Sequence, residues 1–308
     1  MDFNSKYNLI VILGPTASGK TRLAALLADK INGAIISADS RQLYKRMDIG
    51  TGKDYDDYVV NGKTIPCYLI DIYEPGYKSN VFEYQKNFMD AYTAICSEGK
   101  MPLLCGGTGM YIEAVTKAYK LISVPVNQGL RDELQTKSLP ELEQILASYK
   151  KLHNKTDSDT IKRAVRAIEI EEYYKNNPDF DISLPEINPL YIGVEVDREV
   201  RRARITERLK KRLDHGMIKE VEELLESNIK AEDLIYYGLE YKFITLYLTG
   251  KLEYNEMQQQ LNIAIHQFAK RQMTWFRKME REGTLIHWIN GNLPPEKFID
   301  KVVGLSCF

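Results

Sequence analysis

Several features that would assign this chain to a particular class of protein are scarce or missing. Its 308 residues contain four cysteines, none in a CxxC pair, and isolated thiols are typical of a reducing compartment and not of a disulfide scaffold. The longest apolar runs, such as residues 9–13, are far shorter than the ~20 residues that cross a bilayer. Residues 1–4 offer no basic start of a signal peptide. We therefore expect a cytoplasmic protein with no membrane contact.

An excess of one charge sign is missing as well. The chain has 42 Lys and Arg against 43 Asp and Glu, a net charge of -1, whereas nucleic-acid binding normally shows as a basic excess. That near-zero total conceals two adjacent segments of opposite charge. Residues 198–219 contain nine basic and three acidic residues, and residues 220–240 contain one basic and seven acidic ones. The basic block is either a phosphate-binding surface, whose affinity would fall with salt, or a solvated exterior.

The pattern of apolar runs predicts an α/β fold with a parallel sheet. We expect strands at residues 9–13, 34–36, 68–70, 102–105, 190–196 and 284–288, and helices at 22–30, 81–97, 130–149 and 158–174. Polar, helix-compatible sequence separates the fourth strand from the fifth. The expected organisation is a core that contains a P-loop, its first part at 1–118 and its second, mostly helical part at 190–308, interrupted by a mainly helical insertion at 119–189.

A phosphate-binding loop directly follows the first expected strand. The pattern G-x-x-x-x-G-K-[ST] is met by Gly14, Pro15, Thr16, Ala17, Ser18, Gly19, Lys20 and Thr21. In such a loop, backbone N–H groups and a helix N-terminus surround anionic oxygens, the lysine neutralises charge and the last hydroxyl can bind Mg²⁺. The loop is typical of nucleotide-binding and ATP-binding proteins, but it does not specify which polyphosphate it holds.

GTPases and small-molecule kinases also contain such a loop. Asn154 to Asp157 match the N-K-x-D pattern of GTPases, but no Asp in the chain is followed three positions later by Gly, and no buried strand precedes the tetrapeptide. We interpret the match as accidental. A small-molecule kinase stays open, because the loop and an aspartate at a strand end are all that this class strictly shares.

Two further clusters follow expected strands. Asp39 comes after the second strand, where a carboxylate can position Mg²⁺ or accept a proton, or simply cap the next helix. Gly106, Gly107 and Gly109 follow the fourth strand and allow either close backbone approach to a ligand or a tight turn. Ligands of open α/β sheets bind at the carboxyl ends of strands, so these clusters are expected to meet the loop there.

Together these segments resemble the tRNA dimethylallyltransferase family, also called isopentenyltransferases. The resemblance covers nearly the whole chain and is carried by six segments: GPTASGKT at 14–21, SADSRQLYKRMDIGTGK at 37–53, LIDIYEP at 69–75, PLLCGGTGMYI at 102–112, RAVRAIEI at 163–170 and FAKRQMTWFR at 268–277.

The resemblance implies transfer of a dimethylallyl group from dimethylallyl diphosphate to N6 of adenosine 37 in tRNA, with Mg²⁺. It implies that residues 14–21 hold the diphosphate leaving group, that Thr21 binds Mg²⁺ and that Thr16 lies near the reacting carbon or its phosphate. Asp39 would accept the proton of the adenine amine, a poor nucleophile because its lone pair is delocalised. The P-loop would then hold a leaving group, so ATP need not be a substrate.

The resemblance also implies residues that hold the anticodon loop. They are Asp39, Ser40, Arg41, Gln42, Lys162, Arg163, Arg166, Lys270, Arg271, Gln272, Trp275 and Arg277. Cations beside aromatic rings suit backbone contact and base stacking, although Trp275 and Phe276 equally suit the core, which we favour for them. The insertion is expected to contact tRNA, and the protein is expected to act as a monomer.

The chain departs from the family pattern at three positions, Tyr237, Glu240 and His266. Tyr237 and His266 stand where basic residues are expected, and an acidic side chain near a diphosphate weakens anion binding unless it points away. Two alternatives therefore accompany the transferase: a diverged tRNA-binding paralogue with weak transfer activity, and a P-loop small-molecule kinase.

Overall fold

The computed structural model describes residues 6–119, 121, 123–149, 159–177 and 185–306. The chain divides into two compact units. The first consists of Met1–Tyr119 with Glu186–Phe308, and the second of Lys120–Pro185. This division lies close to the predicted boundaries at 119 and 189. Among the described residues, no helix is both long and apolar enough to span a membrane.

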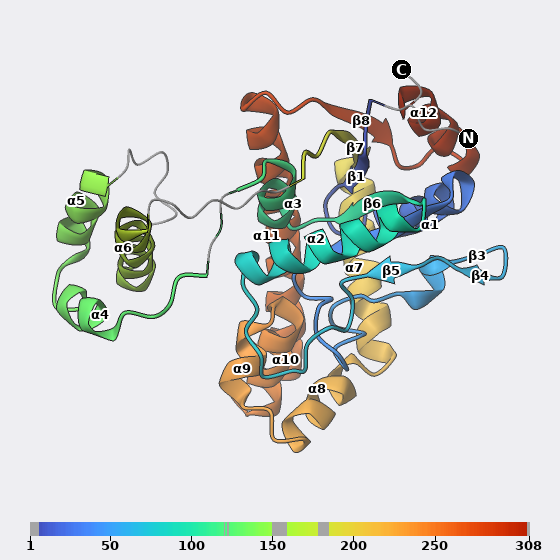
Figure 1. The fold of residues 1–308 in the computed structure, drawn as a ribbon. Coiled ribbons are helices and arrows are strands. Elements are labelled where there is room, and N and C mark those ends of the chain that lie inside the picture. Colours follow the sequence, from blue (N-terminus) through green and yellow to red (C-terminus); the bar gives the residue numbers. More distant parts are fainter. Residues whose placement is uncertain (1–5, 120, 122, 150–158, 178–184, 307–308) are drawn as a thin grey trace. The chain divides into compact units, whose positions relative to one another are not determined.

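A parallel sheet forms the centre of the first unit (Figure 1). Within the described residues it has six strands in the order β5 (Cys67–Tyr68), β2 (Gly33–Ala38), β6 (Met101–Gly106), β1 (Leu9–Leu13), β7 (Pro189–Glu195) and β8 (Ile286–Asn290). All of its strand pairs are parallel. The α/β fold expected from the apolar runs is thereby confirmed.

Apolar side chains on both faces of the sheet explain why the strands are continuous hydrophobic runs. Along β1, Ile10 and Ile12 face one cluster, which includes helices α1 (Lys20–Ile31) and α12 (Pro295–Ser306). The alternate residues of β1 face a second cluster, which includes helices α2 (Val81–Ser97) and α3 (Gly109–Thr116). Successive strand residues point to opposite faces, so each strand joins both halves of the core.

The C-terminal half of the first unit is mostly helical. It contains α7 (Arg198–Asp214), α8 (Met217–Glu226), α9 (Ala231–Tyr236), α10 (Leu239–Leu248) and α11 (Tyr254–Arg281). The buried residues of α11 recur every three or four positions, at Met257, Leu261, Ile265, Ala269, Gln272, Phe276 and Met279. This spacing lays one face of a 28-residue helix against the core. It also carries Gln272 to the phosphate-binding loop.

The segment between β2 and α2 departs from the expectation. It contains the short helix η1 (Tyr55–Tyr58) and a hairpin of β3 (Val59–Val60) and β4 (Lys63–Thr64). The strand expected at 68–70 ends at Tyr68, because Leu69 and Asp71 adopt φ values of 61° and 56°. Those left-handed conformations break the extended chain. The buried ammonium of Lys53 binds Asp71 and holds this bend.

The second unit contains the helices α4 (Gln128–Leu134), α5 (Leu139–Tyr149) and α6 (Ile161–Asn176). The single helix expected at 130–149 is therefore two. Pro140 lies in the first turn of α5, where its missing N–H is tolerated, but it cannot continue a helix from the preceding turn. Leu142, Leu146 and Ile168 pack in the core of this unit. The GTPase-like tetrapeptide at 154–157 lies outside the described residues.

Candidate functional site

The phosphate-binding loop connects β1 to α1, the context that its motif requires. Gly19 precedes α1 with φ of 80°, and Ala17 has φ of 62°. Positive φ values here turn backbone N–H groups toward one concave surface. Lys20 folds back over the loop and donates a hydrogen bond to the carbonyl of Pro15 at 3.4 Å. Desolvation lowers the pKa of Lys20, while the neighbouring Cys105 and Asp39 raise it.

Two hydroxyl groups of the loop suit an anionic ligand and its metal. The Ser18 hydroxyl is buried and has no hydrogen-bond partner among the described residues, and Thr21 lies in the first turn of α1. Within the same residues, no group of three or more His, Cys, Asp or Glu side chains is placed to hold a metal. Mg²⁺ commonly binds through few protein groups together with phosphate oxygens. The loop therefore fits a metal carried with a diphosphate.

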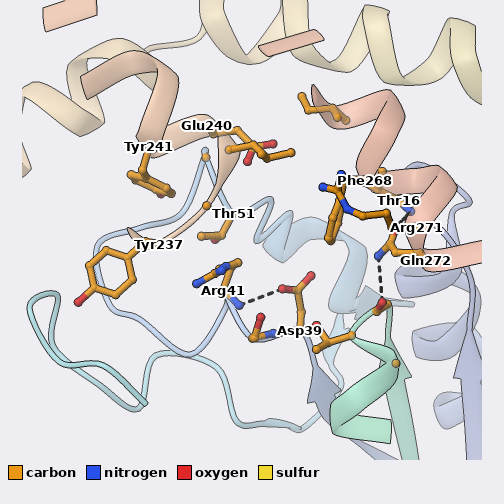
Figure 2. A pocket seen from close by; sticks show the side chains of 18 of the residues that line it. Thr16, Asp39, Arg41, Thr51, Tyr237, Glu240, Tyr241, Phe268, Arg271 and Gln272 are labelled. Atoms are coloured by element: carbon orange, nitrogen blue, oxygen red, sulfur yellow. Dashed lines mark hydrogen bonds between the residues drawn. The ribbon is translucent and has the colours of Figure 1, made fainter. Parts of the chain in front are cut away.

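A cavity of about 450 Å³ opens beside this loop. It lies where β1, β2 and β6 end, because Thr16, Asp39 and Gly107 line it. Helices α7, α10 and α11 complete its wall. Of the predicted site residues, it brings together Thr16, Asp39, Ser40, Arg41, Arg271, Gln272 and Trp275. Figure 2 labels Thr16, Asp39, Arg41, Arg271 and Gln272 among them. This is the edge of the sheet at which ligands of open α/β folds bind.

Asp39 follows the last residue of β2 and lies on the cavity wall (Figure 2). One carboxylate oxygen accepts a hydrogen bond from the N–H of Arg41 at 3.0 Å. The residues after Asp39 form a turn and not a helix, so the helix-capping alternative is wrong. The bond to Arg41 instead closes an Asx turn, which holds the carboxylate in one orientation.

Gln272 of α11 connects the phosphate-binding loop to the turn after β6. Its amide oxygen accepts a hydrogen bond from the N–H of Thr16 at 2.8 Å, and its amide nitrogen donates to the carbonyl of Gly107 at 3.0 Å. A Cβ at Gly107 would lie 2.2 Å from that nitrogen. Both ends of this buried amide are thus used internally. The tRNA contact through Gln272 stays a prediction, and the two bonds add a role in holding the loop.

Two arginines of α7 reach the cavity and were not singled out from the sequence. Arg208 donates a hydrogen bond to the Thr16 hydroxyl; burial and the charge of Arg212 lower its pKa to about 10. Arg212 binds the Asp54 carboxylate at 3.1 Å. Gly52, with φ of 72°, makes room for it, since a Cβ there would lie 2.4 Å from the guanidinium. Their spacing of four residues on one helix face was the available sequence signal.

The three departures from the family pattern occupy different environments. Tyr237 is fully buried and its hydroxyl donates to the carbonyl of Tyr77 at 2.7 Å. His266 lies 3.3 Å from the Thr206 hydroxyl of α7 and does not line the cavity. Glu240 and Tyr237 both line it (Figure 2). Burial raises the pKa of the Glu240 carboxyl, whereas the nearby charges of Arg212 and Arg208 lower it.

Aromatic residues of α11 divide between core and cavity. Phe276 is fully buried, which confirms the core interpretation for it. Trp275 lines the cavity, and its indole N–H donates to the buried carboxylate of Glu113 at 2.7 Å. Phe268 is 39% exposed on the cavity wall, with the Arg271 guanidinium 5.8 Å from its ring centre. Phe268 is a base-stacking candidate that sequence reasoning missed.

Other predicted tRNA contacts have internal partners. Gln42 is buried between the Ser37 hydroxyl at 3.0 Å and the Gly52 carbonyl at 3.1 Å, and its contact with RNA stays a prediction. In the second unit, Arg166 binds Glu169, and Arg163 pairs with Asp159 at 2.6 Å. The remaining cations, Lys162, Lys270 and Arg277, are exposed.

Comparisons with known proteins agree on one family. The sequence matches the family model described as IPP transferase over residues 42–279 and the one described as isopentenyl transferase over residues 7–72. It is 61% identical to a protein of Phocaeicola vulgatus named tRNA dimethylallyltransferase 2, over 97% of this chain and 98% of that protein. It is 64% identical to tRNA dimethylallyltransferase 1 of Parabacteroides distasonis, over 95% of each chain.

The fold is also similar to a solved structure. The crystal structure of a tRNA isopentenylpyrophosphate transferase from Bacillus halodurans superposes with a TM-score of 0.71 at 29% sequence identity. The match covers 98% of this chain and 96% of that one. Sequence and fold thus lead to the same family as the motifs.

Proposed function

Because the chain belongs to the tRNA dimethylallyltransferase family, we propose that it transfers a dimethylallyl group from dimethylallyl diphosphate to N6 of adenosine 37 in tRNA. One observation carries the proposal: the Asp39 carboxylate and the phosphate-binding loop open onto the same cavity. A proton acceptor and a site for the leaving group are the two elements that this reaction requires.

The diphosphate is held by the loop. Its backbone N–H groups and the N-terminus of α1 face the anion, and Lys20 and Arg208 add positive charge. Thr21 and diphosphate oxygens would hold Mg²⁺, which supplies charge neutralisation of the leaving group when bound. Gln272 keeps the Thr16 N–H in place through its bond at 2.8 Å. These groups stabilise the charge that develops on pyrophosphate as it leaves.

The transfer exchanges one bond for another. The bond between the allylic carbon and its phosphate oxygen breaks, and pyrophosphate departs with the electron pair. The lone pair of N6 forms the new bond to that carbon, and Asp39 accepts the proton that N6 loses. The flipped adenine enters between Asp39 and the aromatic side chains Phe268 and Trp275.

Replacement of Asp39 tests the function. Protein, dimethylallyl diphosphate, Mg²⁺ and an anticodon stem-loop with adenosines 36 and 37 are expected to yield N6-isopentenyladenosine, measured by mass spectrometry of nucleosides. Asp39→Asn is expected to lower kcat by about 10²- to 10⁴-fold, the usual contribution of a general base. Asp90→Asn, at an exposed position of α2, is the matched control.

Three outcomes decide between the alternatives. No product from wild type, or equal rates for wild type and Asp39→Asn, contradicts the transferase. Binding of tRNA with only trace product favours the diverged paralogue, the alternative supported by Glu240 in the cavity, whereas turnover near roughly 1 s⁻¹ excludes it. Phosphorylation of a small acceptor by ATP, without prenyl transfer, would instead indicate the kinase.

We also propose that the protein acts as a cytoplasmic monomer. Light scattering of the active protein with and without tRNA, and fractionation of cells, test the two statements.

A further inference from the structure

A cluster of cations lies at the start of α7, outside the cavity. Arg198, Arg201 and Arg202 occupy its first two turns. Arg277 of α11 is close enough for its charge to act on Arg201. The pKa of Arg201 is lowered by burial and by the charges of Arg198 and Arg277, with Asp197 acting in the opposite direction. Burial and the charges of Arg202 and Arg201 lower the pKa of His266. Burial is the larger of the effects on Arg201, and the positive charges of the neighbouring arginines add to it.

This cluster is not neutralised within the part of the chain that the structure describes. There, none of Arg198, Arg201, Arg202 and Arg277 has a carboxylate within 4.0 Å. The Asp197 carboxylate instead caps α7 through the N–H of Glu199 at 2.9 Å.

Two cations further along α7 differ in this respect. Lys211 pairs with Glu207 at 2.7 Å, and Arg212 pairs with Asp54 at 3.1 Å. Arg204 donates a hydrogen bond to the Asn292 side chain at 2.9 Å. The basic block of the sequence therefore contains paired residues and a separate group of arginines that lack an anionic partner.

The helix connects this group to the cavity. Arg201 and Arg208 are seven residues apart, which on an α-helix places them on nearly the same face, about 10 Å apart along the axis. Arg208 lines the cavity and binds Thr16 of the phosphate-binding loop. One nucleic-acid strand carries a charge about every 3.4 Å of helix axis. The cluster is therefore about three nucleotides away from a base held in the cavity.

We propose that Arg198, Arg201 and Arg202, beside Arg277 for which the family resemblance already implies tRNA contact, bind the phosphate backbone of the tRNA substrate about three nucleotides from the reacting adenosine. The inference rests on the proposed function and adds a contact surface to it. Guanidinium groups suit this role because their planar donors match phosphate oxygens, and regular spacing of those phosphates satisfies several arginines at once.

The test removes charge from α7 and leaves the cavity unchanged. The triple variant Arg198→Gln, Arg201→Gln, Arg202→Gln is compared with wild type for binding of an anticodon stem-loop over a range of salt concentrations. We expect at least tenfold weaker binding, and a slope of log Kd against log salt that is smaller by about two, since each lost phosphate contact removes about 0.7. The KM for dimethylallyl diphosphate and kcat at saturating RNA are expected to stay unchanged.

Two matched variants separate charge from structure. Lys210→Gln removes an exposed cation about 180° around α7 from Arg201, and it is expected to keep wild-type binding. The triple replacement by lysine keeps the charges and is expected to restore most of the salt slope. Circular dichroism of each variant verifies the fold.

Failure of this inference is distinguishable from failure of the proposed function. An active wild type whose triple glutamine variant has the same Kd and salt slope overturns the RNA surface and leaves the transferase intact. An equal loss of RNA affinity in Lys210→Gln also overturns it, because the affinity would then depend on the net charge of the protein and not on this cluster. Unchanged RNA binding together with lost binding to a polyglutamate peptide would assign the cluster to an acidic protein partner instead.

Discussion

Removal of the Gln272 amide is expected to damage the phosphate-binding loop without altering any group that touches the reacting atoms. Gln272→Met keeps the length of the side chain but leaves the N–H of Thr16 and the carbonyl of Gly107 without their partners, now bonded at 2.8 and 3.0 Å. An unsatisfied buried polar group costs about 1–3 kcal/mol. The two groups together set the expected loss of stability at about 2–6 kcal/mol if water does not replace the amide.

Part of this cost is expected to appear in catalysis, because the displaced N–H of Thr16 belongs to the diphosphate site. The KM for dimethylallyl diphosphate is expected to rise at least tenfold, while the KM for RNA changes less. Chemical denaturation gives the stability, and initial rates give the two constants. Gln267→Met, at an exposed position of the same helix, is the matched control. A variant with normal stability and a normal KM for the donor would refute the bridging role, and a selective rise in the RNA KM would return Gln272 to tRNA binding.

Two further predictions concern carboxylates. Burial acts to raise the pKa of Glu169, but hydrogen bonds from Arg131 and Arg166 hold it at about 2 against a usual 4.5. Its ion pairs therefore stabilise the second unit fully above pH 4.5, and up to about 3 kcal/mol is lost as the pH falls toward 2; amide exchange in residues 120–185 should show this dependence in wild type and not in Glu169→Gln. In the cavity, Glu240→Gln removes a negative charge near Arg208 and Arg212, so inhibition by pyrophosphate should tighten several-fold. An unchanged inhibition constant would mean that Glu240 does not oppose the bound anion.

The sequence predicted the part of the site that follows the strands, but not the part that the later helices contribute. Residues 14–21 and Asp39 follow strands whose apolar runs are visible in the sequence, and parallel strands bring their carboxyl ends together. Local order along the chain therefore predicted their positions. Arg208 and Phe268 lie on helices far along the chain, and only the packing of α7 and α11 brings them to the cavity. Arginine is common on solvated helix faces and phenylalanine in helix cores, so residue type did not distinguish these two.

Residue type was least informative for polar side chains that suit two roles. Gln42, Gln272 and Arg166 are all capable of binding RNA, yet each is used within the protein. For the two glutamines burial explains the difference, because an enclosed backbone N–H or carbonyl requires a partner and a nearby glutamine amide satisfies it. Neither the motif nor the charge of a residue reveals which backbone groups become enclosed.

The sequence by itself determined the α/β class, the phosphate-binding loop, the carboxylate at the end of the second strand and the family, because these depend on short motifs and on the period of apolar residues. The tertiary structure alone decided which cations of the basic block enter the cavity, which pair with carboxylates and which remain as a separate cluster. The physical reason is that charge along a chain is additive, whereas the energy of a charge depends on its burial and on neighbours that only folding brings near.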